Sequence, residues 1–170
     1  MATLAGISPA DLVLTPRGVR FLGRTYPCTI GRAGVTADKR EGDEATPRGV
    51  HQIVGVLYRA DRVPAPAAWA VPIGPGDLWS DDPRDPAYNH LVRAPHAFSH
   101  ESLRRTDPMY DVVLVTDWNW PEAEPGRGSA IFVHQWRQRG VPTAGCIALS
   151  RAHTRALAAR IVPGTRLIVP

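Results

Sequence analysis

Short hydrophobic runs separated by turn-forming residues make up the first part of the chain. Residues 12–14 and 19–22 are two such runs, and the Pro-Arg-Gly segment between them is typical of a hairpin turn. Residues 26–30 continue the pattern, and residues 50–58 alternate well enough to predict a longer strand. The chain is therefore expected to begin with β-strands, apart from a loop-like segment over residues 31–49.

Three hydrophobic runs in the second half predict buried strands. They cover residues 110–116, residues 129–134 and residues 145–149. The second run ends at His134, and the third contains Cys146. Two chemically reactive side chains are thus expected on strands that follow one another along the chain.

A single helix is expected directly after these strands. The hydroxyl of Ser150 can accept from the first free N–H groups of a helix, and residues 151–161 carry hydrophobic side chains on one face. Pro163 and Gly164 stop this helix, and residues 165–169 close the chain as a strand. Strands around one main helix predict an α+β fold that is mainly β.

Residues 61–109 show little periodicity and are rich in Pro, Asp and Trp. A structureless loop of this length is unusual in a compact domain and is usually functional where it occurs. Within it, a short helix over residues 99–105 is expected.

Composition and charge narrow the class of protein. The 170 residues fit one domain, residues 1–170, and 17 prolines with 15 glycines favour a loop-rich β fold. The net charge is +4, but the basic residues are scattered and form no nucleic-acid-binding motif. No stretch approaches the roughly 20 apolar residues of a membrane span, and the N-terminus lacks a secretory signal pattern. We expect a monomer that does not bind nucleic acid and has no membrane span.

Cys146 and His134 form a candidate catalytic pair. A thiolate is the reactive form of cysteine, and a neighbouring histidine can take the proton of the thiol. Gly145 lacks a Cβ, so the N–H groups of Gly145 and Cys146 could hold the oxyanion of an acyl-transfer intermediate. Spacing alone, however, favours a buried structural cysteine over a nucleophile. Cys28 is interpreted as a small buried hydrophobe or a bystander, because a permanent bridge to it would block Cys146.

The segment over residues 134–150 resembles the catalytic segment of the YkuD-type L,D-transpeptidases. In that family a histidine and a loop are followed by Ser/Thr-His-Gly-Cys and an apolar residue. Here His134 is the upstream histidine, and the other matching positions are Thr143, Gly145, Cys146 and Ile147. Further family-like segments occur in the same order along the chain: residues 39–49, residues 79–82, Tyr88-Asn89, Tyr110-Asp111 and residues 127–132.

Two positions depart from the common pattern of this family. Ala144 stands where many members carry a second histidine, and Ala148 stands where many carry Arg or Asn. The segment therefore resembles the shorter branch, which has Pro-Thr-x-Gly-Cys-Ile/Val-Ala-Leu. The resemblance implies a YkuD-like mixed β-sheet sandwich or barrel with one main helix after the catalytic cysteine. The missing histidine bears on donor-peptide specificity more than on activation of the thiol.

The resemblance implies a cysteine acyltransferase that acts on peptidoglycan. Cys146 would attack the third residue of a stem tetrapeptide, His134 would protonate the departing D-Ala, and the backbone carbonyl of Gln135 would orient His134. An amine of a neighbouring stem would then receive the acyl group, which gives a 3-3 or a 1-3 cross-link. The resemblance also implies a covalent carbapenem adduct at Cys146, no cofactor or metal, and a location in the periplasm or facing the cell wall.

Several side chains are candidates for binding the stem peptide. Trp136 lies on the loop after the base, and Thr143 and Ala144 belong to the catalytic segment. These three are expected to line the substrate cleft. Further candidates for peptide hydrogen bonds are Tyr88, Asn89 and Asn119.

Other readings of the same residues stay open. On the same fold, hydrolysis could dominate, which would make the protein an L,D-carboxypeptidase, or the domain could bind peptidoglycan without catalysis. A papain-like peptidase is disfavoured, because in that class the cysteine usually precedes the histidine. His96 and His100 have the spacing of a helical metal pair, but exposed loop histidines are the favoured interpretation. For Glu41 and Asp43, a structural role in their loop is favoured over a catalytic carboxylate pair.

Overall fold

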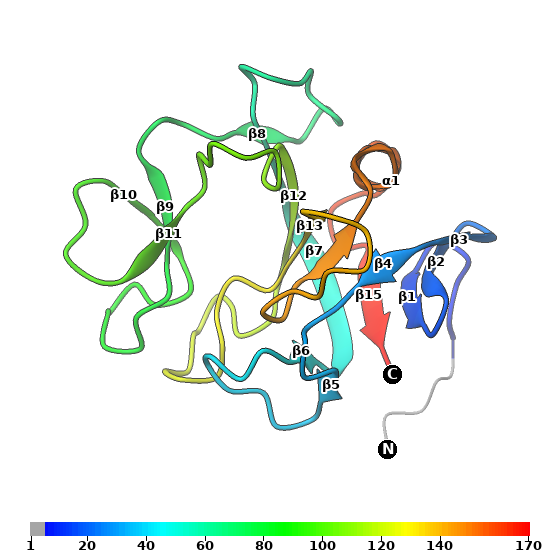
Figure 1. Ribbon diagram of the computed structural model, residues 1–170, viewed down its shortest axis with the longest axis horizontal. Helices are drawn as coiled ribbons and strands as arrows, with labels where there is room; N and C mark the ends of the chain where they lie inside the picture. Colours follow the sequence, from blue (N-terminus) through cyan, green and yellow to red (C-terminus); the bar gives the residue numbers. More distant parts are fainter. Residues whose placement is uncertain (1–5) are drawn as a thin grey trace.

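The computed structural model describes residues 6–170, which are organised around one curved sheet (Figure 1). The sheet has ten strands in the spatial order β3-β2-β1-β15-β7-β12-β13-β14-β4, with β8 paired to β7. In chain order they are β1 (Leu12–Thr15), β2 (Gly18–Phe21), β3 (Arg24–Tyr26), β4 (Cys28–Thr29), β7 (Gly49–Tyr58), β8 (Val71–Pro72), β12 (Val112–Thr116), β13 (Phe132–Gln135), β14 (Ile147–Leu149) and β15 (Arg166–Val169). Because β4 at one end contacts β2 near the other end, the sheet nearly closes into a barrel.

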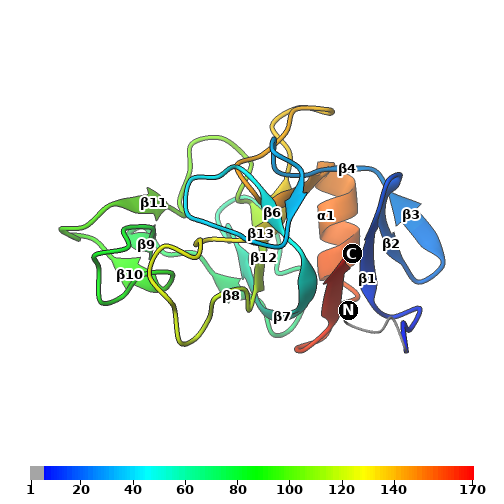
Figure 2. The same ribbon diagram turned by 90° about the horizontal axis from the view of Figure 1, so that it is seen from below.

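The helix α1 (Arg151–Ala158) packs against β12, β13 and β14 (Figure 2). Ser150 caps its N-terminus as predicted, since its side chain accepts from a backbone N–H of the first turn. The helix is shorter than the expected residues 151–161, although the Ile161 N–H still donates to the Leu157 carbonyl and both side chains are buried. Helix ends commonly differ by such a margin because the last turn loosens.

Strand β12 shows how the sheet separates two hydrophobic cores. Val112 and Leu114 belong to the main core, which includes Leu157 of α1. Val113 and Val115 alternate with them and belong to a smaller core on the opposite face, because successive side chains of a strand point to opposite faces. Other members of this smaller core are Trp79, Leu103, Tyr110 and Phe132.

The smaller core is covered by a separate sheet with the order β10-β9-β11. Its strands are β9 (Asp77–Ser80), β10 (Leu91–Arg93) and β11 (His100–Ser102). The predictions of a structureless loop over residues 61–109 and of a helix over residues 99–105 are therefore wrong. Strands this short carry no recognisable period, and distant partners fix them: the ring of Trp79 packs edge-on against Phe132, with 5.0 Å between the ring centroids.

The loop-like segment over residues 31–49 contains one short parallel pair, β5 (Val35–Thr36) with β6 (Thr46–Pro47). Two of its four acidic residues, Glu41 and Asp43, are engaged within the fold, as expected for structural groups. Asp43 pairs with the buried Lys39, and Glu41 accepts from the hydroxyl of Tyr88.

The remaining predicted strands are confirmed with shifted bounds. Pro27 interrupts the strand expected over residues 26–30, which the structure divides between β3 and β4. Both cysteines are free, and the half-buried Cys28 packs against the main core. Within residues 6–170, no helix combines the length and the apolar surface that crossing a membrane requires.

Candidate active site

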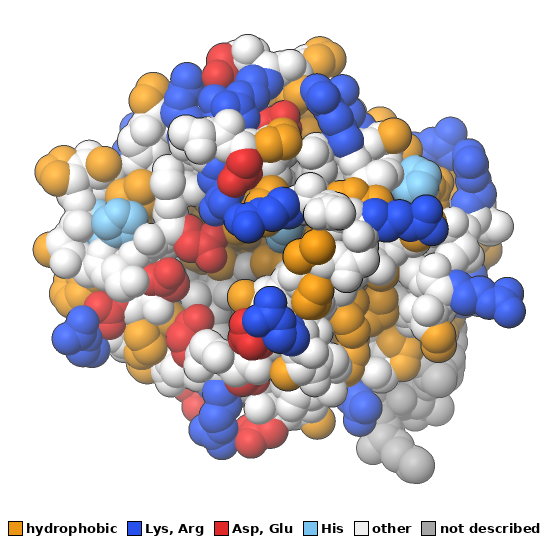
Figure 3. All heavy atoms as spheres, in the orientation of Figure 1, with side chains coloured by type: hydrophobic (Ala, Val, Ile, Leu, Met, Phe, Trp, Pro, Cys, Tyr) orange, Lys and Arg blue, Asp and Glu red, His pale blue; other side chains and the backbone are white. Residues whose placement is uncertain are grey.

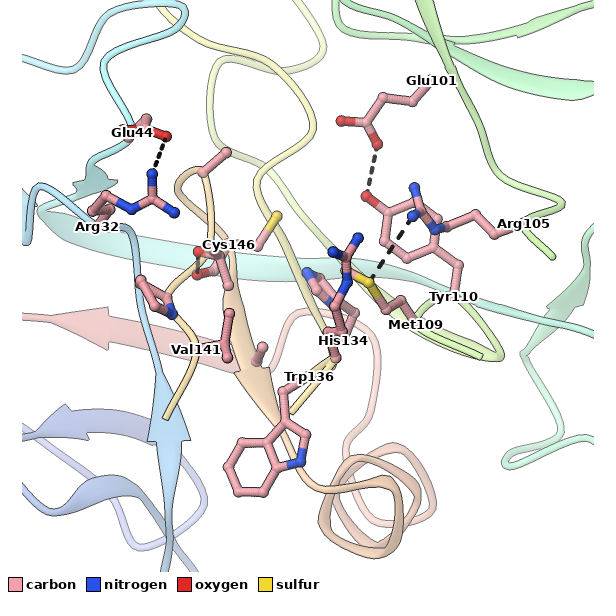
Figure 4. Close-up of a pocket in the computed structure, with 15 residues that line it drawn as sticks. Arg32, Glu44, Glu101, Arg105, Met109, Tyr110, His134, Trp136, Val141 and Cys146 are labelled. Carbon is pink, nitrogen blue, oxygen red and sulfur yellow. Dashed lines mark hydrogen bonds and ion pairs between the residues drawn. The ribbon is translucent and has the colours of Figure 1, made fainter. Parts of the chain in front are cut away.

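One cavity of about 460 Å³ lies on the face of the sheet that carries the smaller core, and both Cys146 and His134 line it (Figure 4). The residues around it come from segments far apart in the sequence, including Arg32, Glu101 and Tyr110. In the space-filling view, side chains of both charges surround the hollow on this face of the molecule (Figure 3).

The pairing of β13 with β14 brings the candidate nucleophile and base together. The two strands are parallel and in register, with His134 opposite Ala148. Since side chains alternate along a strand, His134 and Ala148 share a face with Cys146, two residues before Ala148. A register shift of one residue in β14 would turn Ala148 and Cys146 toward α1, away from His134.

The Cys146 thiol is held in its neutral form. Its Sγ donates to the carbonyl oxygen of Ala130 at 3.1 Å and accepts from the N–H of Phe132 at 3.4 Å. Burial raises the pKa of Cys146 to about 12, with a further contribution from the negative charge of Glu101. The thiol proton is therefore directed at Ala130, and none of the hydrogen bonds between described residues joins Cys146 to His134.

The imidazole of His134 is neutral and fixed in one orientation. Burial lowers the pKa of His134 to about 4. Its Nδ1 lies 2.7 Å from the carbonyl oxygen of Gln135. Because a carbonyl only accepts, Nδ1 carries the proton and Nε2 keeps its lone pair. The ring of Tyr110 packs edge-on against the imidazole, with 5.3 Å between the ring centroids.

The backbone before Cys146 needs a glycine. Gly145 has a φ of +144°, and a Cβ there would lie 2.8 Å from the carbonyl oxygen of Ala45. The Gly145 carbonyl accepts from the hydroxyl of Thr46 at 2.8 Å, so the catalytic segment is tied to β6. The close approach that the sequence suggested is thus made by another backbone segment, Ala45–Thr46.

The hydrogen bonds of Thr143 reduce the number of backbone N–H groups that are free to bind an oxyanion. The Gly145 N–H donates to Thr143 Oγ1 at 3.1 Å, and this hydroxyl donates to the Cys146 carbonyl at 2.6 Å. None of the hydrogen bonds between described residues uses the Cys146 N–H. Of the two amides expected to face an oxyanion, only that of Cys146 is free in this structure.

The predicted substrate-binding residues fall into two groups. Trp136, Thr143 and Ala144 line the pocket with Cys146. The structure does not bring the other three into its lining, because their polar atoms hold loops together. These are Tyr88, Asn89 and Asn119.

Asn89 uses both ends of its amide within the fold. Its Oδ1 accepts from Trp79 Nε1 and from the Ala130 N–H, both at 2.9 Å. Its Nδ2 donates to the carbonyl oxygens of Trp118 and Asn119, at 3.0 Å and 2.7 Å. Asn89 therefore acts on the pocket only indirectly, through the segment that carries Ala130.

Sequence reasoning missed one wall of the pocket. Glu101 on β11, together with Arg105, Met109 and Tyr110, lines the side nearest the three-stranded sheet. The sequence predicts a loop and a short helix for the residues that include Glu101 and Arg105, so this segment is not expected to line the pocket. Among the family-like segments of the sequence, the Tyr110-Asp111 pair was the one that pointed to this wall of the pocket.

The histidines considered for metal binding have other partners. His96 Nε2 lies 2.6 Å from Asp85 Oδ2, and His100 Nδ1 lies 2.7 Å from the carbonyl oxygen of Phe98. Within residues 6–170, no group of three or more His, Cys, Asp or Glu side chains could hold a metal ion.

Comparison with known proteins identifies one family. No curated protein matches the sequence. The family model of the YkuD L,D-transpeptidase catalytic domain matches residues 10–169, which is nearly the whole chain and includes every residue of the pocket. The mainly β fold with one helix after the cysteine agrees with this match. The chain therefore belongs to the YkuD family of L,D-transpeptidase catalytic domains.

Proposed function

We propose that this protein is a peptidoglycan L,D-transpeptidase that works through a thioester on Cys146. The observation that carries the proposal is the pocket that Cys146 shares with His134, whose Nε2 is left as a free base. The YkuD match supports the same chemistry. The proposal treats residues 1–170 as one catalytic domain, acting as a monomer in the periplasm or at the cell wall.

Acylation begins from the neutral thiol. A resting ion pair is disfavoured, because burial raises the pKa of Cys146 to about 12 and lowers that of His134 to about 4. The proton therefore leaves Sγ as the sulfur attacks the carbonyl carbon of the third stem residue, with Nε2 as general base. For this, the thiol turns from the Ala130 carbonyl toward the imidazole. The Gln135 carbonyl keeps the ring in place and stabilises the imidazolium that forms.

The oxyanion of the tetrahedral intermediate needs hydrogen-bond donors. The free N–H of Cys146 is the first of these, and losing one such donor typically costs about 3 kcal/mol of transition-state stabilisation. The N–H of Gly145 can join it only by leaving Thr143 Oγ1. Thr143 thus controls how many backbone donors the intermediate meets.

Collapse of the intermediate and transfer of the acyl group complete the reaction. His134 gives its proton to the nitrogen of the departing D-Ala, and the C–N bond breaks. An amine of a neighbouring stem then attacks the thioester, its proton passes through His134 to the sulfur, and a 3-3 or 1-3 cross-link forms. Water in place of the amine gives the L,D-carboxypeptidase reaction, the alternative on this fold.

The walls of the pocket supply candidate contacts for the stem peptide. Trp136, Val141 and Pro142 offer apolar surface beside Thr143 and Ala144. Ala144, where many relatives carry histidine, leaves room there for the donor peptide.

The experiment follows products from disaccharide-tetrapeptide muropeptides by mass spectrometry. We expect D-Ala release with cross-linked dimers from the wild type, and neither from Cys146→Ala. Cys28→Ala is the matched control, because Cys28 lies on β4 outside the pocket and should leave turnover near the wild-type level. Release of D-Ala without dimers would assign the hydrolase instead. A wild type as inactive as Cys146→Ala would leave only a peptidoglycan-binding domain.

A carbapenem gives a second, independent test of the nucleophile. Intact-protein mass should increase by one carbapenem adduct in the wild type and in Cys28→Ala. No adduct should form on Cys146→Ala. An adduct that persists in Cys146→Ala would place the reactive group elsewhere.

A further inference from the structure

Glu101 is a carboxylate in the pocket without a counter-ion. Two carboxylates line the pocket, and Glu44 is paired with Arg32 at 3.4 Å. Glu101 forms no ion pair with any residue in 6–170. Its Oε2 accepts from the hydroxyl of Tyr110 at 2.7 Å, and no hydrogen bond between described residues uses its Oε1. One oxygen of a charged group is thus left for a ligand.

The surroundings of Glu101 favour a cation. Burial raises its pKa, and the charges of Asp81 and Glu41 raise it further, against the hydrogen bond from Tyr110 and the charge of Arg105. Arg105 also lines the pocket, but its guanidinium binds both oxygens of Asp107, at 2.6 to 3.0 Å. A buried carboxylate in such a setting is stabilised by an added cation or by a proton.

The two ends of the pocket differ in charge and in origin. Glu101 and the Arg32–Glu44 pair lie on opposite sides of Cys146 (Figure 4). Glu101 belongs to β11 of the three-stranded sheet, whereas Thr143 and Ala144 belong to the catalytic segment on the main sheet. An acyl transfer between two stems must bring two chains to one sulfur from different directions. The Glu101 end of the pocket suits the stem peptide whose reacting group carries a positive charge.

We propose that Glu101 binds the primary ammonium group of the acyl acceptor and takes its proton before the amine attacks the Cys146 thioester. This inference rests on the proposed function. An alkylammonium has a pKa near 10.4, so well under about 1% of it is a neutral nucleophile at pH 7. One ammonium proton moves to Glu101 and leaves a neutral amine. The amine nitrogen then forms the amide bond as the C–S bond breaks, its second proton passes through His134 to the sulfur, and Glu101 later releases its proton to solvent.

Glu101→Gln separates the two half-reactions. It keeps the shape of the side chain but removes the charge that binds the ammonium and accepts its proton. We expect the ratio of cross-linked dimer to hydrolysed tripeptide to fall at least tenfold at pH 7. The first turnover of D-Ala, which precedes the acceptor, should change less than the product ratio, because the negative charge that raises the pKa of Cys146 is gone. Raising the pH from 7 to 9 increases the neutral amine about 100-fold and should restore much of the ratio.

Tyr110→Phe distinguishes amine recognition from a structural role. It breaks the same hydrogen bond but retains the carboxylate, so the product ratio should stay closer to the wild type than in Glu101→Gln. The proposal is overturned if both variants lower the ratio equally, if Glu101→Gln stays within twofold of the wild type, or if pH 9 restores nothing. A wild type that releases no D-Ala would overturn the proposed function itself, and this inference with it.

Discussion

The side-chain oxygen of Asn89 accepts from the backbone N–H of Ala130 at 2.9 Å. This contact fixes the residue whose own carbonyl receives the proton of the Cys146 thiol. Ala130 has a φ of +52°, a conformation that non-glycine residues adopt only when neighbouring contacts hold it. Asn89 lies outside the pocket, but it positions the Ala130 carbonyl, which accepts the hydrogen bond of the resting Cys146 thiol.

Asn89→Ala should destabilise the protein and slow acylation together. It leaves the Ala130 N–H and the indole N–H of Trp79 without their acceptor, and each unsatisfied buried donor costs about 1–3 kcal/mol. Urea unfolding without substrate should reveal a loss of at least about 1 kcal/mol. An unchanged unfolding free energy with a raised KM would instead assign Asn89 to peptide binding, as the sequence first suggested.

Gly145→Ala should abolish acylation, whereas Gly140→Ala should not. Both glycines have positive φ, +144° and +82°, so both substitutions strain the backbone. Only at Gly145 would the new Cβ meet another backbone, the Ala45 carbonyl at 2.8 Å, and nothing lies within 4 Å at Gly140. We expect at least a 100-fold drop in D-Ala release for Gly145→Ala, and a change below threefold for the control. Equal effects of the two variants would contradict this.

The sequence predicted the main sheet well because its strands are long or buried enough to show a pattern. Residues 50–58, for instance, become β7, and the run that ends at His134 becomes β13. The cap at Ser150 was also predictable, since it depends on one residue and its immediate neighbours. These local patterns were enough to predict that His134 and Cys146 lie on strands that follow one another along the chain.

The sequence could not predict which segment covers the site. Strand β11 has three residues and forms only by pairing with β9, so its carboxylate could not be placed beside Cys146 from local patterns. The sequence also could not predict that the Cys146 thiol donates to the Ala130 carbonyl, because this hydrogen bond depends on the left-handed backbone conformation of Ala130. Both features depend on contacts between residues distant in the sequence.

Ser150→Ala should weaken α1 and leave the chemistry largely intact. The Ser150 hydroxyl accepts from the His153 N–H at 3.2 Å, and losing such a cap typically costs about 1 kcal/mol. The free energy of unfolding should fall by this amount in urea. The helix supports β13 from the face opposite the pocket, so D-Ala release by folded protein should change less than threefold. A fall in D-Ala release without a fall in the free energy of unfolding would contradict a purely structural role for Ser150.

Stability should depend on pH through His134 in a defined window. Its folded pKa is about 4, below the value near 6.5 of an unfolded histidine. Between these values the unfolded chain binds more protons, so the free energy of unfolding falls as the pH falls from about 6.5 to about 4. The full effect of this one group is about 3 kcal/mol.

His134→Gln isolates that contribution, because it removes the titrating group from both states. His51 has a pKa lowered mainly by burial and acts in the same direction, so the variant should keep a shallower slope in the same window. Urea unfolding at pH 4.5 and pH 7 should differ less for His134→Gln than for the wild type, by about 2 kcal/mol. The neutral base also persists in the folded wild type below pH 6, so D-Ala release should decline near pH 4 rather than near 6.5. Equal pH slopes for the two proteins would show that the pKa of His134 is the same in the folded and the unfolded chain, and D-Ala release would then decline near pH 6.5.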